Sequence, residues 1–483
     1  MKKVWKYLII TILMLLGLCC VGVLYLFFIP NSSLFNITYL HKSETVSAAP
    51  AEQSTVSRIV LNSRAYKVNI WSTKDQTVQL EVVSKTFGFV STDNKHVKVS
   101  SNIKNNTLTF DIQEAYGFAI LNGSHINLYI PQDKIYDLSL TNKSAQTNLL
   151  STKIQINNFT YKTNSGDLNL EQGKISGGIS LDLNRAVGSI SNVFETNKNN
   201  ISLKLTTGKF YAKNSTLGDV TISKNERGVI SIKECNRLSS NIATAGGSIN
   251  ISKLAHINVK TSDTDIKITE VTDGAIVYLT KMGSVNIGTL KGVSDISTNS
   301  GSINLNVIES PLTLKTNSGN INVKAAKMTI DITSEYGDVV INFHKDAQSY
   351  LDNNNSRVLI ANIYNSKLTA NGVEHIGLAS ADEGIKVRGN GRVYLNMKNV
   401  YGNNSIEGKN GNVKTVINKD SEYILTTQSN SGNVKVNLMQ IASFGGYKTK
   451  TLTTTNVNCT SSANSLTVTT NNGDLTILDT KFA

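Results

Sequence analysis

A short unit of polar residues followed by apolar alternation recurs along this chain and constrains its fold more than any other feature. It occurs as "YKTNSGDLNLEQ" (161–172), "DISTNSGSINLNV" (295–307), "TLKTNSGNINVKAA" (313–326) and "QSNSGNVKVNL" (428–438). The shared pattern is Φ-x-Φ-x-T-x-x-G-x-Φ-x-Φ, where Φ is an apolar residue. Because apolar residues alternate on both sides of a polar break, each unit predicts a strand, a turn and a second strand.

The glycine of this unit recurs at intervals of 17–22 residues. The aligned positions are Gly166, Gly188, Gly208, Gly228, Gly247, Thr264, Gly283, Gly301, Gly319 and Gly337, and later Gly411, Gly432 and Gly473. We interpret each glycine as a turn residue that tolerates positive φ, with Thr264 marking a turn that is built differently. A propeller blade needs about 40–45 residues, so the unit instead fits one coil of a β-solenoid, which is stable only when coils stack.

The repeat divides the chain into segments of an all-β fold, an elongated β-solenoid with coils of about 18–22 residues. Residues 58–135 alternate like strands but lack the unit, so we expect a lead-in that caps the first coil. Residues 136–345 carry regular repeats, residues 346–400 form an irregular segment, and residues 401–483 return to C-terminal coils. The pattern leaves the handedness of the solenoid open.

The N-terminus carries a targeting signal. Lys2, Lys3 and Lys6 precede the uncharged residues 7–29, which are long enough to cross a bilayer as one helix. The positive flank predicts that residues 1–6 are cytoplasmic, that residues 30–57 are an extracytoplasmic linker and that the rest of this single-pass membrane protein lies outside. A cleaved signal peptide is the alternative, although the apolar run is long for one and no small-residue cleavage site closes it.

The charge balance predicts the class of partner. With 48 Lys and Arg against 35 Asp and Glu, the formal charge is +13. A basic surface outside the membrane favours anionic cell-wall polymers, acidic glycans or lipid headgroups, and contacts with surface proteins remain open. A solvated surface without a specific partner is the alternative. Nucleic acid is not expected, because the basic residues are dispersed along a chain that lies largely outside the cytoplasm.

The pattern offers no catalytic, cofactor-binding or metal-binding residues. Among the positions that follow the aligned residues 166–337, only Asp167, Asp265 and Asp338 are acidic, and neutral or basic units separate them. A polysaccharide lyase or hydrolase needs carboxylates that converge on one face. The six histidines and four cysteines form no cluster with metal-ligand spacing. We therefore expect a protein that is not an enzyme.

Two surface features are candidates for binding. Phe87 and Phe89 in "FGF", and Tyr116 and Phe118 in "YGF", could expose rings to sugars or proteins, or could instead cover the glycine of a neighbouring strand. The repeated threonine and asparagine residues could stack into ladders that stabilise the turns, with glycan binding by this polar row as the second interpretation. These repeated pairs are Thr163/Asn164, Thr298/Asn299 and Thr316/Asn317.

The order of a membrane segment, a strand-rich lead-in, an Ile130–Pro131 step and T-x-S-G-D/S/N-I/L-x-L units resembles the bacterial "putative adhesin" family. That family is a domain of unknown function, built as a β-solenoid on membrane-anchored or secreted proteins. The resemblance covers residues 58–483, with residues 346–400 departing from the pattern. It implies an extracytoplasmic structural or binding role and carries no established catalytic residues. A carbohydrate-active β-helix enzyme and an envelope-stress accessory protein that acts through membrane partners are the alternatives.

Overall fold

A computed structural model describes two compact units built of β-strands. The described residues are 10–19, 36–47, 53–90, 98–113, 117–120, 124–344, 359–363, 368–374, 386–389, 393–400, 403–408, 411–438, 441–457 and 464–480, except 152, 172, 194–199, 216, 218, 226, 234–238 and 280. The first unit comprises Met1–Asp182 with Ala186–Thr196, and the second comprises Leu183–Arg185 with Asn197–Ala483. The all-β class predicted from the alternation is confirmed.

Within the apolar run 7–29, residues 10–19 form a helix whose side chains are exposed. The rest of that run lies outside the described residues. Among the residues that are described, no helix has both the length and the apolar character needed to cross a membrane.

The first unit combines a parallel stack with antiparallel strands. Strand β2 (Arg58–Ser63) pairs in parallel with β6 (Thr107–Gln113) and β9 (Ile135–Asn142), and β3 (Lys67–Thr73) pairs in parallel with β8 (His125–Pro131) and β10 (Thr147–Leu149). The stack continues through β11 (Gln155–Thr163), β12 (Leu168–Glu171), β13 (Lys174–Ile175), β14 (Ile179–Leu183) and β15 (Val187–Ser191). Because β2 and β3 pair in parallel with strands beyond residue 135, the expected boundary between lead-in and repeats does not separate two structures.

Antiparallel strands cover the start of this stack. Strand β5 (Lys98–Lys104) pairs with β6, and β4 (Gln79–Val90) pairs with β1 (Asn36–Ser47), β7 (Gly117–Ile120) and β8. Pro131 is the last residue of β8 and lies opposite Thr73, a strand end where a missing N–H removes little pairing. The strands of 58–135 therefore occupy the edge that a stack of parallel strands would otherwise expose.

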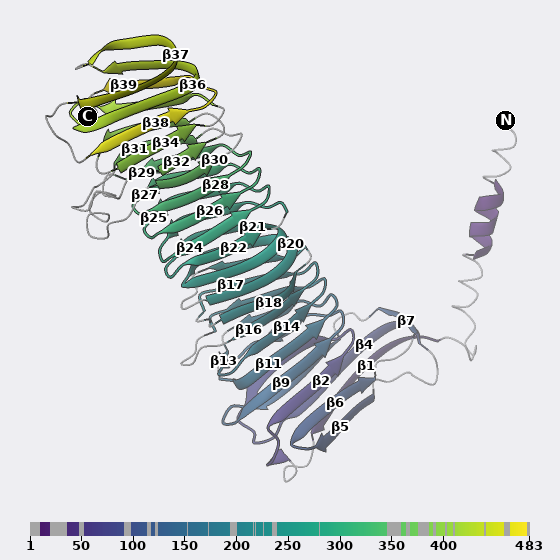
Figure 1. The fold of residues 1–483 in the computed structure, drawn as a ribbon. Coiled ribbons are helices and arrows are strands. Elements are labelled where there is room, and N and C mark those ends of the chain that lie inside the picture. The colour runs from purple at the N-terminus through teal and green to yellow at the C-terminus, as the bar shows by residue number, and fades with distance from the viewer. Residues whose placement is uncertain are drawn as a thin grey trace. The chain divides into compact units, whose positions relative to one another are not determined.

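The second unit stacks pairs of strands side by side (Figure 1), and between residues 285 and 343 equivalent strands recur every 18 residues. One row of parallel strands is β22 (Ala275–Leu279), β24 (Ser294–Thr298), β26 (Leu312–Thr316), β28 (Ile330–Ser334) and β30 (Leu359–Ile363). The other row is β23 (Val285–Leu290), β25 (Ile303–Ile308), β27 (Ile321–Ala326), β29 (Val339–Phe343) and β31 (Leu368–Glu374). Ile303 lies opposite Val285 and Ile321 opposite Ile303, so equivalent residues stack directly.

The same two rows begin earlier in the unit with β16 (Ile201–Leu205), β17 (Lys209–Lys213), β18 (Asp219–Asn225), β19 (Val229–Lys233), β20 (Ser239–Leu254) and β21 (His256–Val271). The apolar positions of the repeat point into the core: Ile303 and Leu305 are fully buried, and Ile321 and Val323 are no more than 1% exposed. Each such side chain contributes roughly 1.5–3 kcal/mol by leaving water. The predicted inward pattern of the repeat is confirmed.

Close stacking, not positive φ, is what requires glycine at the corners of the regular repeats. A Cβ atom on Gly301 would lie 1.4 Å from the carbonyl oxygen of Gly283, and one on Gly319 would lie 2.0 Å from that of Gly301. A Cβ on Gly337 would lie 1.8 Å from the carbonyl oxygen of Gly319. Positive φ is found at Gly283 and Gly247, but not at these three glycines. Glycine is therefore required at these corners because the backbone of one repeat is in direct contact with the backbone of the next.

The predicted threonine and asparagine ladders are present at these corners. Thr298 and Thr316 are buried, and the Oγ1 of Thr298 lies 3.2 Å from the Oγ1 of Thr316. The Gly319 N–H donates to the Oγ1 of Thr316 at 2.9 Å, so the threonine closes its own corner. On the surface, the Nδ2 of Asn317 donates to the Oδ1 of Asn299 at 3.1 Å. Both ladders join successive repeats.

Three glycines are placed differently from the prediction. Gly188 lies inside β15 and opposite Leu168, so Ala186 and not Gly188 is equivalent to the corner residue Gly166. Gly247 and Gly432 lie within the long strands β20 and β36 (Tyr423–Leu438). At Gly247 the ladder with β21 continues through the corner, whereas the pairing of β36 stops at Ser429 and resumes at Asn433 and Val434. The remaining predicted corners lie between strands, at Gly166, Gly208, Gly228, Gly283, Gly301, Gly319, Gly337, Gly411 and Gly473.

The segment 346–400 departs in spacing but continues the pairing. Strands β30 and β31 pair in parallel with β32 (Lys386–Gly389) and β33 (Val393–Asn399), which pair in turn with β34 (Asn403–Gly408) and β35 (Val413–Asn418). The Nδ2 of Asn371 donates to Asn342, 29 residues earlier, and that of Asn396 donates to Asn371, 25 residues earlier. Both parallel rows thus run through the irregular segment, and longer connections account for the blurred rhythm.

The C-terminal strands stack out of chain order, which the repeat pattern does not predict. Strands β38 (Ser465–Thr470) and β39 (Leu475–Thr480) lie between β34/β35 and β36 (Tyr423–Leu438), pairing in parallel with both sides. Strand β37 (Ile441–Val457) then pairs antiparallel with β36. A Cβ on Gly473 would meet the carbonyl oxygen of Gly411, and one on Gly432 would meet that of Gly473, which confirms the order 411, 473, 432.

Candidate functional site

The outward side chains of six neighbouring strands in the second unit form polar rows. Ile249, Ile266 and Ile303 point inward, so the residue that follows each of them must point outward. The register aligns these outward residues across β19, β20, β21, β23, β25 and β27 as Ser231, Asn250, Lys267, Asn286, Asn304 and Asn322. Two residues further along the same strands stand Lys233, Ser252, Thr269, Gly288, Asn306 and Lys324.

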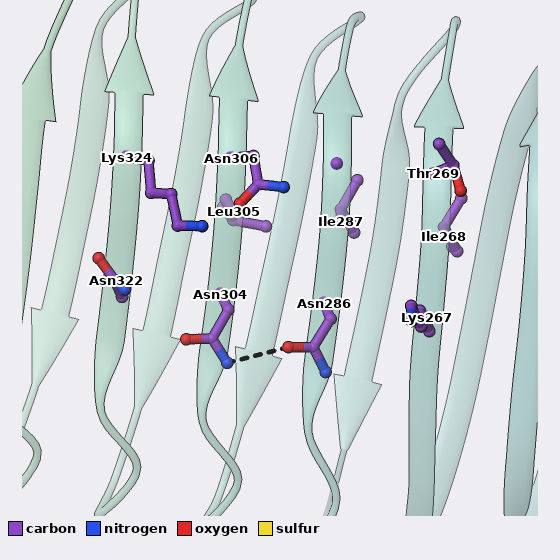
Figure 2. A pocket seen from close by; sticks show the side chains of 11 residues that line it. Lys267, Ile268, Thr269, Asn286, Ile287, Asn304, Leu305, Asn306, Asn322 and Lys324 are labelled. Atoms are coloured by element: carbon purple, nitrogen blue, oxygen red, sulfur yellow. Dashed lines mark hydrogen bonds between the residues drawn. The ribbon is translucent and has the colours of Figure 1, made fainter.

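Two surface hollows lie over these rows and share Lys267 and Thr269. One, of about 440 Å³, extends over β21, β23, β25 and β27, and the other, of about 400 Å³, extends over β19, β20 and β21. Together we call them the polar groove. Figure 2 shows the first hollow, where the Nδ2 of Asn304 donates to the Oδ1 of Asn286 at 3.0 Å and fixes both amides. Gly288 adds no side chain, which leaves room between Thr269 and Asn306.

The polar groove is basic. Lys233, Lys267 and Lys324 line it, and no aspartate or glutamate is among the described residues that line either hollow. Amide and ammonium groups donate hydrogen bonds to anionic oxygens. Neighbouring parallel strands are about 4.8 Å apart, so these donors recur at a short, regular interval along the groove.

Glu270 and Glu309, near the ends of the groove strands β21 and β25, are paired with lysines in a ladder of alternating charge. Glu270 follows Thr269 in sequence and lies between Lys253 at 3.1 Å and Lys291 at 3.6 Å. Glu309 lies between Lys291 at 3.7 Å and Lys327 at 2.8 Å. The pKa of Glu270 is lowered chiefly by its hydrogen bond with Lys253, and the pKa of Glu309 is lowered chiefly by its hydrogen bond with Lys327. Both glutamates stay ionised but paired, so they oppose an anionic ligand only weakly.

The acidic residues that follow the corner residues stabilise the stack. The Oδ1 of Asp167 accepts a hydrogen bond from the Val187 N–H at 2.8 Å. The Oδ1 of Asp265 accepts one from the Ser284 N–H at 2.9 Å. At Asp338 the direction is reversed, and its N–H donates to Asn320 at 2.9 Å. Among the described residues, no group of three His, Cys, Asp or Glu side chains could hold a metal ion.

The predicted surface aromatics are only partly described. Phe87 and Phe89 lie in β4 and Phe118 lies in β7, where the backbones of Phe89 and Phe118 are directly opposite. This pairing places the described residues 87–89 and 117–118 of the two stretches on neighbouring strands. Tyr116 lies outside the described residues. Whether these rings bind sugars or proteins stays a prediction. The polar groove was not among the predicted sites, although its residues are the x positions of each Φ-x-Φ run.

Comparisons with known proteins identify one family that the chain matches over more than half of its length. A family model described as Toastrack DUF4097 matches residues 56–191 and 176–366. No curated protein matches the sequence.

Three solved structures are similar to parts of the chain. A "putative cell adhesion protein" from Clostridium sporogenes shares 12% identity over 42% of this chain and 100% of that chain, with a TM-score of 0.23. A "putative adhesin" from Bacteroides fragilis shares 14% identity over 64% of this chain and 100% of that chain, with a TM-score of 0.20. A "putative adhesin" from Parabacteroides distasonis shares 14% identity over 73% and 97%, with a TM-score of 0.15. These TM-scores are too low to support an argument about function.

Proposed function

The chain belongs to the Toastrack DUF4097 family, and we propose that it is a non-enzymatic, membrane-anchored β-solenoid that binds an anionic polymer outside the cytoplasm. The parallel register, which advances by 18 residues per repeat, supports the solenoid interpretation. The residues 7–29 and their lysine flank support the anchor and its orientation. The observation that carries the binding role is the polar groove, because Lys267 and Lys324 line it and the described lining residues include no aspartate or glutamate.

An extended polyanion fits the groove better than a compact ligand does. Lys233, Lys267 and Lys324 belong to β19, β21 and β27, so their charges are spread along the stack and not focused on one point. The amides of Asn286, Asn304 and Asn322 lie between these lysines along the same face. A polymer with one anionic group per residue could contact several repeats at once, and such contacts add through effective concentration.

We expect the double variant Lys267→Gln and Lys324→Gln to bind polyanions at least about tenfold more weakly than the unchanged protein, which equals about 1.4 kcal/mol. Each lysine removed loses a charge-assisted contact with the polymer. The measurement is binding of inorganic polyphosphate and of polygalacturonate to the full chain in detergent at about 0.1 M salt, where surface electrostatics are only partly screened.

The matched control is the double variant Lys260→Gln and Lys315→Gln. Both lysines are exposed, on strands β21 and β26, and neither lines the polar groove. This pair changes the net charge by the same amount and should leave binding nearly unchanged. Equal losses in both double variants would mean that only the overall charge of +13 attracts polyanions, and the proposed groove would then be rejected.

The proposed location is tested on intact cells. Protease added outside the cells should cut within residues 58–483 and leave a short N-terminal fragment with the membrane, because residues 1–6 are proposed to be cytoplasmic. A tag at residue 1 and another at residue 483 would report the two ends separately. Protection of both tags until the cells are lysed would contradict this topology.

A further inference from the structure

A second cluster, formed by Trp71, Tyr129, Glu81, Asn127 and Asn69, lies on the outward face of the first unit. The residues come from β3, β4 and β8, which the register places side by side. Trp71 lies opposite Tyr129, and one row further along Asn69 lies opposite Asn127, which lies opposite Glu81. We call this the Trp71 cluster. It contributes nothing to the polar groove, which belongs to the second unit.

Hydrogen bonds hold the polar members in fixed orientations. The Nδ2 of Asn69 donates to the Oδ1 of Asn127 at 3.2 Å, and the Nδ2 of Asn127 donates to the Oε2 of Glu81 at 2.9 Å. The ladder is extended by Asn148, whose Nδ2 donates to the Oδ1 of Asn69 at 3.1 Å. All three asparagine amides of this ladder donate toward Glu81, which defines the positions of their amide oxygens and nitrogens.

The same network holds both aromatic rings. The Tyr129 hydroxyl donates to the Oε2 of Glu81 at 3.1 Å, and the Nε1 of Trp71 donates to the Oδ1 of Asn127 at 3.4 Å. Trp71 nevertheless remains 38% exposed, while Tyr129, Glu81 and Asn127 are half-buried. An exposed indole is unfavourable in water, so covering it with a ligand is favourable. Because the hydrogen bond to Asn127 already orders the indole, binding a ligand costs less side-chain entropy.

This combination matches the surface of a pyranose ring. A sugar presents an apolar face of C–H groups, which an indole can cover, and a rim of hydroxyls that both donate and accept. Each asparagine amide has two N–H donors and two acceptor lone pairs, and the ladder uses only one N–H of Asn69 and of Asn127. We propose that the Trp71 cluster is a binding site for a neutral hexose unit of a glycan, with Trp71 covering the ring and Asn69 and Asn127 contacting its hydroxyls.

The charge of the cluster separates this site from the polar groove. Glu81 is the carboxylate of the cluster, and its Oε2 accepts hydrogen bonds from Asn127 and Tyr129. A polyanion would be repelled there, whereas a neutral glycan would not. The two sites thus differ in the ligand they select, and the failure of one proposal leaves the other standing.

Tryptophan fluorescence tests the proposal directly, because Trp5 and Trp71 are the two tryptophans of the sequence. In a Trp5→Phe background, emission comes from Trp71 alone. We expect cellotriose or the trimer of N-acetylglucosamine to change this emission saturably in the full chain in detergent. Adding Trp71→Ala should weaken binding at least tenfold by calorimetry, whereas Trp71→Phe should retain part of the affinity.

The control is Tyr211→Ala, because Tyr211 is also 38% exposed but lies on β17 in the second unit. It should leave sugar binding unchanged, and thermal unfolding of all variants should remain close to that of the parent. Three results would overturn the proposal: no saturable change with either sugar, unchanged affinity in Trp71→Ala, or a response to choline alone, which would indicate a site for cations over the ring.

Discussion

Replacing Gly319 by alanine should destabilise the repeats around residues 294–343 by about 3 kcal/mol or more. The new Cβ would lie 2.0 Å from the carbonyl oxygen of Gly301 and 2.5 Å from its carbonyl carbon. Backbone cannot move aside as a flexible side chain can, so two repeats would have to separate at this corner. Separation would also strain the hydrogen bond between the buried hydroxyls of Thr298 and Thr316, which joins the two repeats. Chemical denaturation of the full chain, followed by circular dichroism, measures the loss.

The control for this prediction is Ser318→Ala at the adjacent exposed position. Its Oγ lies 3.4 Å from the carbonyl oxygen of Asn299, a long contact that contributes little. We therefore expect a loss below about 0.5 kcal/mol. If Gly319→Ala unfolds at the same denaturant concentration as Ser318→Ala but no longer binds polyanions, then Gly319 acts in binding, and the structural role assigned to it is wrong.

The corner glycines show which parts of this fold the sequence predicts and which parts only the structure reveals. The repeat predicts where corners occur, because a polar break of constant length interrupts an apolar alternation. It does not reveal whether glycine is needed for its own φ or for a neighbour, since both requirements select the same residue. Gly188 illustrates a second point: its spacing predicts a corner, but Ala186 occupies that place and Gly188 lies in β15.

The two candidate sites differ in how far the sequence predicts the contacts that form them. Asn286 and Asn304 are 18 residues apart, so the periodic repeat itself predicts that they stack. Trp71 and Asn127 are 56 residues apart, and Asn69 and Asn148 are 79 residues apart, in the region that lacks the unit. Strand order there must be known before these side chains can be brought together. A periodic groove can therefore be found from sequence once its register is known, whereas the Trp71 cluster requires the fold.

Strand order matters most at the C-terminus, where a chain that ends at residue 463 should lose the structure of residues 403–438. The removed strands β38 and β39 are the shared parallel partners of β34/β35 and of β36. They also carry Leu466, Val468, Leu475 and Ile477, which are fully buried and contribute on the order of 6 kcal/mol or more together. We expect amide hydrogen exchange within 403–438 to accelerate at least about 100-fold, while 294–343 changes little because each repeat contacts only its neighbours.

A matched pair of point variants isolates the inserted strand without shortening the chain. Val468→Asp places an unpaired carboxylate at a fully buried position of β38, whereas Thr467→Asp places the same group on its half-buried outer face. Val468→Asp should reproduce the faster exchange of 403–438, and Thr467→Asp should not, because burial of an uncompensated charge is what destabilises the strand. The competing outcome is that β36 moves by one place and pairs directly with β34 and β35, since Gly411 and Gly432 offer equivalent corners. In that case the amides of 403–438 would stay protected from exchange in the shortened chain, and β38 and β39 would not be needed for the folding of β34, β35 and β36.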